Sequence, residues 1–358
     1  MMDFLVIGGG IAGVSAGARL SRLGRVAVLE AEDWLGHHAS GRSAAMFEET
    51  YGSASTIALN RASRHYHETA AGGVLSPRGL MLIGTADSRD AFAADLELMA
   101  MEEISVEEAC ARVPVLNPDA IAGAGYHAEA WDIDTARLIQ HFAREVRANG
   151  GQVLTGRKIS RISRAGGGWT AETARGAFSA RILVNAAGAW VDEIAALAGV
   201  EPLGFRPLRR SMARIPAPGG LDVSGWPMIY GAGESWYAKP DAGSLLVSPA
   251  EETPVEAHDA WPEDLTLAEG LARFEAVTSE PVTRLQASWA GLRTFSPDRS
   301  LVIGPDPHEP AFVWFAGQGG YGFQTAPAAS RLLADILAGR PSELDAATRA
   351  ALSPERFF

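Results

Sequence analysis

The stretch FLVIGGGIAGVSAGARLSRLGRVAVLE, residues 4–30, has the pattern of a strand, a glycine-rich turn, a helix and a second strand. Residues 4–7 are continuously apolar, as in a buried strand, and residues 11–23 carry apolar side chains at helical spacing. Three glycines in the order G-x-G-x-x-G, starting at Gly8, allow a tight turn, the approach of a pyrophosphate and close helix–strand packing. The stretch therefore predicts an α/β fold with a Rossmann-like domain, in which a dinucleotide lies on the helix N-terminus.

An acidic residue, Glu30, ends the second predicted strand, about 20 residues beyond the turn. A carboxylate at this position binds a ribose 2′-hydroxyl and repels a 2′-phosphate, which disfavours NADP. The alternative, a glycine-rich turn that binds nothing, does not explain why strand, helix and acid follow in this order. NAD and FAD both remain open at this point.

Composition excludes several classes of protein. The chain has 358 residues, of which 47% are hydrophobic, and a net charge of -12, which argues against a nucleic-acid partner. No apolar run reaches the roughly 18 residues of a membrane-spanning helix, and the first residues do not resemble a secretory leader. The single cysteine, Cys110, excludes an internal disulfide, and no motif predicts a metal site. We therefore expect a cytoplasmic protein with no membrane segment.

Three further stretches distinguish FAD from NAD. GHHASGRSAAM (36–46) is a small-residue loop suited to run along a cofactor, where a nicotinamide enzyme would continue with another strand and helix. ARILVNAAGAWVDEIAALAGV (180–200) predicts a buried strand, a small-residue turn and a helix. GQGGYGFQTA (317–326) follows an apolar strand and precedes a helix expected after Thr325. A cofactor that meets both chain ends is long, and backbone N–H groups at the second glycine loop can stabilise a reduced flavin. These stretches favour FAD.

The motifs together resemble the D-amino-acid oxidase-like family of FAD enzymes, and within it the D-arginine dehydrogenases. The matching segments, in chain order, are the N-terminal glycine motif, SGRSAA, DIDTARLIQ, LVNAAGAW, RRS, YAKPDAG, WAGLRTF and GQGGYGFQT. The resemblance implies a discontinuous FAD-binding domain (1–46, 132–199 and 290–358). It also implies an α+β substrate domain with a mixed sheet (47–131 and 200–289).

The resemblance implies non-covalent FAD, although His37 and His38 adjoin the flavin loop and leave a covalent link as an alternative. The residues that it assigns to FAD are Gly8, Gly10, Ala12, Gly13, Glu30, Ala31, Ala39, Ser40, Gly41, Arg42, Ser43, Ala44, Ala45, Ile159, Ala187, Gly188, Trp190, Gly319, Gly320, Tyr321, Gly322, Phe323 and Gln324.

Oxidation of an amino acid needs a clamp for the substrate carboxylate, and the planar fork of arginine suits that task. By resemblance, Arg210 and Arg293 bind the carboxylate with the hydroxyl of Tyr237, and Tyr51 lies on a loop that closes over the substrate. The carbonyl of Gly320 would accept a hydrogen bond from the amine. Each arginine has the alternative of a surface ion pair, Arg209 is an equally good fork, and each tyrosine has the alternative of a packing role.

The resemblance assigns Met46, Glu48, Leu80 and Tyr321 to the substrate pocket, and the sequence departs from the family there. Leu80 stands where a glutamate grips the guanidinium of D-arginine, and Met46 replaces a histidine that faces the amine. An apolar residue cannot satisfy a buried guanidinium, so a neutral side chain is favoured. Glu48 and the neighbouring Glu49 could replace the lost acid, but charged loop residues usually face solvent, and we expect both to do so.

These inferences predict FAD-dependent oxidation of a D-amino acid with a neutral side chain. A hydride passes from Cα to flavin N5, and the imino acid product hydrolyses to a 2-oxo acid and ammonia. The alternatives are a flavin enzyme for secondary or N-methylated amines, a dehydrogenase of basic D-amino acids that uses Glu48, and a non-catalytic flavin-binding sensor. The sequence does not identify the electron acceptor, which could be a quinone, another carrier or dioxygen.

Overall fold

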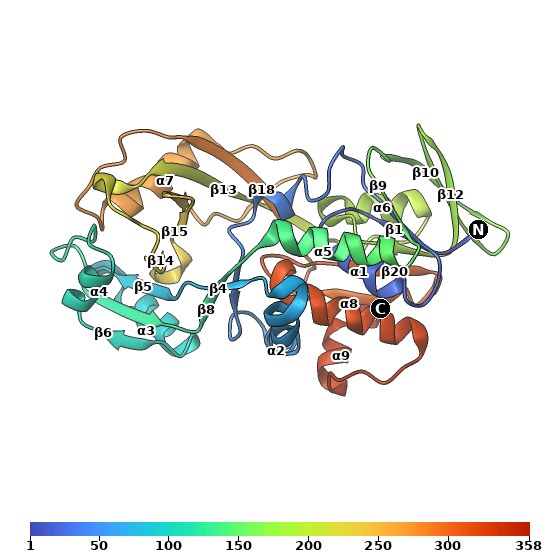
Figure 1. Ribbon diagram of the computed structural model, residues 1–358, viewed down its shortest axis with the longest axis horizontal. Coiled ribbons are helices and arrows are strands. Elements are labelled where there is room, and N and C mark those ends of the chain that lie inside the picture. Colours follow the sequence, from blue (N-terminus) through green and yellow to red (C-terminus); the bar gives the residue numbers. More distant parts are fainter.

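The structure, a computed structural model, describes residues 1–358 apart from the side chain of Ala165. Two large β-sheets lie side by side along the longest axis of the molecule, and both chain termini belong to the half on the right of Figure 1. A three-stranded sheet is the third sheet of the chain. The mixed-sheet α/β fold that the sequence predicts is confirmed.

The first sheet contains eight strands, and five of them run parallel in the order β9-β2-β1-β12-β20. Strand β1 occupies the centre because its residues from Phe4 to Ile7 are buried and apolar, as the sequence predicts. The eight strands are β1 (Met2–Ile7), β2 (Val26–Leu29), β9 (Gln152–Leu154), β10 (Ile159–Ala165), β11 (Gly168–Thr173), β12 (Gly176–Asn185), β19 (Val302–Pro305) and β20 (Phe312–Ala316).

Helices cover both faces of this sheet. On one face, α1 (Ile11–Leu20), α5 (Thr135–Ala148) and α8 (Gly322–Ala338) share a hydrophobic core with strands β1 and β2. On the other face, α6 (Val191–Ala198) packs with a second cluster that includes Trp314. Helix α5 begins at a side-chain cap, because Asp134 Oδ1 accepts a hydrogen bond from the N–H of Arg137 at 2.9 Å.

Helix α8 begins at Gly322, four residues before the predicted start at Ala326. The N-cap is Tyr321, and no side chain caps this end of the helix. Glycine was expected to delay the helix because of its conformational entropy. Instead, the burial of the first turn from Phe323 to Ala326 against α1 and α2 stabilises it.

The second sheet contains nine strands in the order β17-β13-β16-β15-β14-β5-β7-β6, and β18 pairs with the other edge of β13. The long β13–β18 ladder sets Arg210 opposite Gly291 and Leu208 opposite Arg293. The strands are β5 (Leu80–Gly84), β6 (Glu102–Ile104), β7 (Gly123–His127), β13 (Arg206–Pro216), β14 (Met228–Gly231), β15 (Tyr237–Asp241), β16 (Ser244–Ser248), β17 (Thr253–Pro254) and β18 (Ala287–Phe295). The helices of this half are α3 (Arg89–Leu98), α4 (Val106–Arg112) and α7 (Asp264–Glu275).

The third sheet joins β3 (Met46–Glu48), β4 (Leu75–Pro77) and β8 (Ala130–Ile133). Helix α2 (Ala54–Thr69) follows β3 and packs on α8, where His67 Nε2 lies 2.9 Å from the carbonyl oxygen of Gln324. Helix α2 thus belongs to the predicted substrate segment 47–131 but packs beside the first sheet. Strand β18 joins the second sheet, although most of it belongs to the predicted cofactor segment 290–358. The sheets follow the two-part division, and the domain boundaries themselves stay a prediction.

Helix α9 (Ala346–Leu352) lies near the C-terminus and packs beside α2. None of the helices in the described chain combines the length and the apolar composition that crossing a membrane requires.

Candidate functional site

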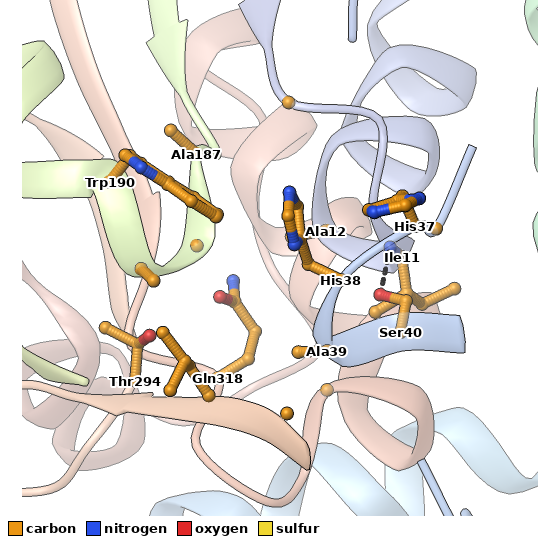
Figure 2. Close-up of a pocket in the computed structure, with 18 of the residues that line it drawn as sticks. Ile11, Ala12, His37, His38, Ala39, Ser40, Ala187, Trp190, Thr294 and Gln318 are labelled. Atoms are coloured by element: carbon orange, nitrogen blue, oxygen red, sulfur yellow. Dashed lines mark hydrogen bonds between the residues drawn. The ribbon is translucent and has the colours of Figure 1, made fainter. Parts of the chain in front are cut away.

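A cavity of about 530 Å³ connects the glycine loop after β1 with the glycine loop before α8. We call it the larger cavity, and Figure 2 shows side chains that line it from several parts of the chain. The sequence-predicted residues that line it are Gly8, Gly10, Ala12, Glu30, Ala31, Ala39, Ser40, Arg42, Ser43, Ala44, Ile159, Ala187, Gly188, Trp190, Arg210, Tyr237, Arg293, Gly319, Gly320, Gly322 and Phe323.

The first glycine loop has the geometry that a pyrophosphate requires. Gly8 has a φ of +111°, and a Cβ atom there would overlap the carbonyl oxygen of Ala186. Gly10 is the N-cap of α1 and offers no side-chain cap, while the N–H of Ile11 donates to Ser40 Oγ at 3.0 Å (Figure 2). The loop therefore brings the positive end of α1 to the cavity wall, where Ser40 is the side chain that bonds its first N–H, and this arrangement fits the diphosphate of FAD.

The carboxylate of Glu30 is held against this loop. Its Oε2 accepts a hydrogen bond from the N–H of Gly9 at 2.6 Å, and its Oε1 accepts one from the N–H of Glu32 at 2.9 Å. Burial raises the pKa of Glu30 in spite of these bonds. The acid lines the larger cavity in a fixed orientation, which suits the ribose contact that the sequence predicts.

The two adjacent histidines line the same end of the larger cavity. The ring of His38 lies 4.5 Å from that of Trp190 (Figure 2). Its Nε2 lies 3.0 Å from Glu32 Oε1. Burial lowers the pKa of His38, so it is neutral near pH 7. The ligand atoms of Glu32, His37 and His38 lie within 4.8 Å of one another. Sequence reasoning did not single out Glu32, which lies two residues after the predicted ribose ligand.

Arg293 lies where the larger cavity meets a second one of about 300 Å³, the smaller cavity. It lines both, and within the described part of the chain no carboxylate forms an ion pair with it. A Cβ atom at residue 320 would lie 3.1 Å from Arg293 Nη1, so a larger residue there would press on the guanidinium. A partly buried cation without a protein counter-ion is suited to bind an anion.

Arg210 also lines both cavities, and its side chain is 7% exposed. Its Nη2 lies 3.3 Å from Glu252 Oε1, and its Nε is buried without a hydrogen-bond partner. Burial and then the charge of Arg293 lower the pKa of Arg210, which stays far above neutrality. Together with the buried Tyr237, the two arginines form a cluster that we call the carboxylate clamp.

Electrostatics keeps Arg293 charged. Burial works against its charge, but the phenols of Tyr237 and Tyr51 and the carboxylates of Glu234 and Glu252 raise the pKa of its guanidinium.

Arg209 is not part of the clamp. Neighbouring residues of a strand point to opposite faces of the sheet, and Arg209 Nη1 instead donates to Glu263 Oε1 at 2.8 Å. Arg209 lines neither cavity, whereas Arg210 lines both.

Tyr51 and Tyr321 lie together in the smaller cavity, with ring centroids 5.3 Å apart. The hydroxyl of Tyr51 donates to Glu234 Oε1 at 2.8 Å. Burial, and then the charge of Glu234, raise the pKa of Tyr51 well above its ordinary value, so the phenol keeps its proton. This bond links the loop after β3 to the second sheet across the smaller cavity.

Four residues that the resemblance assigns to FAD lie outside the lining of both cavities, and each has a structural task. A Cβ atom at Gly13 or Gly41 would overlap the carbonyl oxygen of Gly8 or Gly36, so these glycines allow close packing. The carbonyl of Ala45 accepts a hydrogen bond from Lys239 Nζ. Gln324 Oε1 accepts one from the N–H of Glu48 at 2.6 Å. Their contact with a cofactor stays a prediction.

Met46 and Leu80 also lie outside both cavity linings and belong to an apolar cluster beside the clamp. The cluster includes Met212, Tyr230 and Tyr237. Since Tyr237 and Met212 line the larger cavity, the cluster forms an apolar wall behind them.

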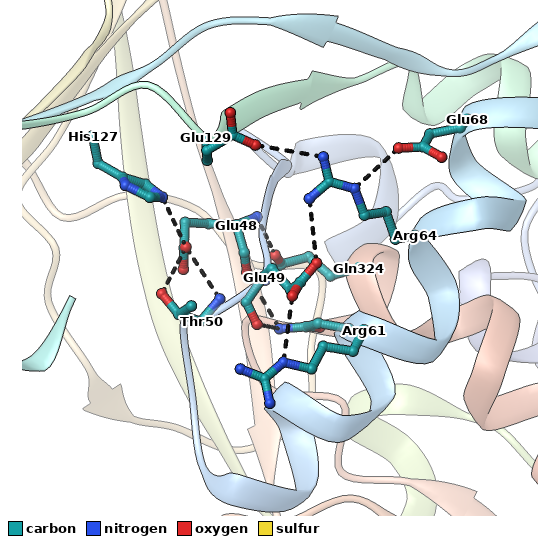
Figure 3. A network of polar contacts seen from close by, with 10 residues as sticks. Glu48, Glu49, Thr50, Arg61, Arg64, Glu68, His127, Glu129 and Gln324 are labelled. Atoms are coloured by element: carbon teal, nitrogen blue, oxygen red, sulfur yellow. Dashed lines mark hydrogen bonds and ion pairs between the residues drawn. The ribbon is translucent and has the colours of Figure 1, made fainter. Parts of the chain in front are cut away.

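The expectation that both glutamates of the loop face solvent is wrong for Glu48, which is 4% exposed (Figure 3). Its Oε1 accepts hydrogen bonds from the N–H and the hydroxyl of Thr50, at 3.1 and 2.8 Å, and lies 3.5 Å from His127 Nε2. Glu49 instead forms ion pairs with Arg61 and Arg64. Strand β3 directs Glu48 inward, whereas loop residues are usually free to turn outward.

Sequence reasoning missed several residues of the larger cavity, among them Met212 and Gln318. Met212 lies two positions beyond Arg210 on β13, so strand alternation would have placed both on one face. Gln318 lies within the second glycine loop, where the resemblance assigned residues 319–324 but not residue 318 (Figure 2).

A family model described as "DAO: FAD dependent oxidoreductase" matches residues 3–336. Glycine oxidase of Bacillus licheniformis is 25% identical over 357 residues, which cover 95% of this chain and 94% of that protein. Hydrogen cyanide synthase subunit HcnC of Pseudomonas aeruginosa is 29% identical over 178 residues, 47% of this chain and 40% of that subunit.

Solved structures share the fold over nearly the whole chain. Glycine oxidase from Geobacillus kaustophilus has a TM-score of 0.81 at 22% identity, with 96% of each chain covered. Iminodiacetate oxidase from Chelativorans sp. BNC1 has a TM-score of 0.79 at 21% identity, with 98% of this chain and 99% of that chain covered. None of these findings supports the closer likeness to D-arginine dehydrogenases.

Proposed function

Because the chain belongs to the DAO family of FAD-dependent oxidoreductases, we propose that it oxidises the α-carbon of a D-amino acid with a neutral side chain. The observation that carries this proposal is Arg293, a guanidinium that faces both cavities and forms no ion pair within the described chain. Its natural partner is the carboxylate of a substrate.

In this proposal, different residues bind the carboxylate and the amine of the substrate. Arg293, Arg210 and Tyr237 hold the carboxylate, and the carbonyl of Gly320 accepts a hydrogen bond from the amine. FAD, when bound, accepts the hydride that leaves Cα. The residues fix the substrate so that this hydrogen points at the acceptor, which is the main contribution that the protein makes to such a reaction. The imino acid is released and hydrolyses to a 2-oxo acid and ammonia.

The apolar cluster around Leu80 and Met46 supports a neutral side chain, since neither residue can satisfy a charged group. Glu48, the residue that a basic substrate would need, is bonded to Thr50 and lines neither cavity in the described structure. The D configuration is supported by the motifs SGRSAA, RRS and WAGLRTF, which resemble those of D-amino-acid enzymes.

A second candidate is oxidation of a secondary or N-methylated amino acid. By resemblance, Met46 replaces a histidine that faces the amine, which removes a hydrogen-bond partner of a primary amine, and Met46 itself lies in the apolar cluster outside both cavity linings. The fold is also that of an iminodiacetate oxidase, whose named substrate is a secondary amine with two carboxylates. The carboxylate clamp serves either candidate equally.

The test measures the loss of flavin absorbance after the FAD-loaded protein is mixed anaerobically with single compounds. These are D-leucine, D-methionine, D-arginine, their L-isomers, glycine and N-methylglycine. Bleaching by D-leucine or D-methionine, but not by D-arginine or the L-isomers, is the expected result. Bleaching by N-methylglycine alone would move the assignment to secondary amines, and bleaching by D-arginine would assign a role to Glu48. No bleaching by any compound would favour a flavin-binding sensor. Reoxidation of the reduced protein with dioxygen or a quinone then identifies the class of electron acceptor.

A further inference from the structure

One wall of the smaller cavity carries a carboxylate of the protein, Glu252, that pairs with the carboxylate clamp and is one-third exposed. Glu252 lines this cavity, and its Oε1 lies 3.3 Å from Arg210 Nη2. Both of its oxygens lie 2.9 Å from Arg299 Nη2, and the guanidinium of Arg299 lies 3.9 Å above the ring of Phe295. One arginine of the clamp is therefore already paired, whereas Arg293 is not.

The charges of the smaller cavity leave room for one anion. Its lining contains three guanidinium groups, Arg210, Arg293 and Arg299, and two carboxylates, Glu234 and Glu252. Three positive and two negative groups leave one unbalanced positive charge. A single substrate carboxylate neutralises it, and a second one would meet Glu252 and Glu234 at close range.

We propose that Glu252 determines specificity: it occupies Arg210 and Arg299, so that the enzyme accepts amino acids with one carboxylate and rejects those with two. The inference rests on the proposed function and adds the substrate class, monocarboxylic amino acids. Repulsion of the wrong ligand is a common way to obtain selectivity, because a like charge placed at close range costs more than a missing contact.

The experiment compares carboxylate binding to the FAD-loaded wild-type protein and to Glu252→Gln. Propionate and succinate serve as probes of one and two carboxylates, and the flavin absorbance change gives each dissociation constant. In the variant, Arg210 and Arg299 are free, so the preference for propionate over succinate should fall by ~10-fold or more. The ratio of kcat/KM for D-glutamate over D-methionine should rise in the same direction.

Glu256→Gln is the matched control, because Glu256 is an exposed glutamate of the same segment, and it is absent from the described lining of both cavities. It removes the same charge and should leave the preference unchanged. An unchanged preference in Glu252→Gln, with the FAD content of the wild type, would overturn the proposal.

If Glu252→Gln does not retain FAD, Arg299→Gln provides the second measurement. It removes one positive charge, so binding of both probes should weaken, and tighter binding would contradict the charge balance. Carboxylate binding needs no turnover, so the two proposals can fail separately. Altered binding without any flavin reduction by amino acids would refute only the proposed function.

Discussion

Replacement of Arg293 tests the carboxylate clamp most directly. Arg293→Gln keeps a polar side chain of similar length but removes the charge and the fork. Since no carboxylate of the described chain pairs with Arg293, the substrate carboxylate would be its only strong partner. Loss of a desolvated, charge-assisted pair costs about 3 kcal/mol, which corresponds to a ~150-fold decrease in kcat/KM.

The same substitution at Arg210, to glutamine, should lower kcat/KM less. Arg210 is paired with Glu252, so its removal releases a carboxylate as well as losing a contact with the substrate. We expect Arg210→Gln to lower kcat/KM by ~10-fold, which corresponds to a loss of about 1.4 kcal/mol of transition-state stabilisation. The order of the two effects follows from the ion pairs alone and not from the resemblance.

The assay is the rate of flavin reduction in anaerobic stopped flow, at amino acid concentrations below saturation. Arg206→Gln is the control, since Arg206 is exposed on the same strand as Arg210. Thermal unfolding provides a second readout: Arg293 is partly buried without an ion-pair partner, so its removal should not lower the melting temperature. A kcat/KM for Arg293→Gln within threefold of the wild type would refute the assignment of the clamp.

Three further changes test the first glycine loop, the ion pair of Lys239 with Asp132 and the buried histidine of helix α2. Gly8→Ala places a Cβ atom against the carbonyl oxygen of Ala186, so the purified variant should lack FAD, as the ratio of absorbance at 450 and 280 nm would show. Lys239→Met removes the partner that lies 2.8 Å from Asp132 Oδ1, and urea unfolding should show a loss of about 2 kcal/mol. Burial lowers the pKa of His67 to about 4, below the ordinary 6.5 of an unfolded histidine, so the unfolded chain binds the proton first as pH falls. Stability should be full above pH 6.5 and fall by about 3 kcal/mol toward pH 4, and His67→Gln should flatten this slope in urea unfolding.

Local patterns in the sequence were sufficient to predict the strand, turn and helix of the first glycine loop. The strand, turn and helix from residue 2 to residue 20 follow from continuous apolar residues and glycines at fixed offsets, which act over short distances along the chain. The same holds for the apolar strand before the second glycine loop. The predicted start of α8 was wrong because burial against other helices stabilises its first turn, and a local sequence pattern does not report such contacts.

Longer-range features do not follow from local patterns, for a physical reason. The resemblance named Arg210 and Arg293, but they come together because β13 pairs with β18, and nothing in either strand specifies that partner. Glu48 is buried because β3 pairs with β8, and the partners of Glu252 come from β13 and from the loop after β18. Ion pairs and burial depend on the register of sheets, whereas motifs report only neighbours in the chain.

One backbone hydrogen bond explains why the site can lie between two sheets and still be precise. The N–H of Gly319, in the loop before α8, donates to the carbonyl oxygen of Thr294 on β18 at 2.9 Å. This bond connects the second glycine loop, which lines the larger cavity, to the residue next to Arg293. The distance between the clamp and the N-terminus of α8 is thereby fixed by the backbone, as positioning of a substrate requires. The side of the smaller cavity that Tyr51 and Glu234 close is held instead by one side-chain bond, so any opening for the substrate should begin there.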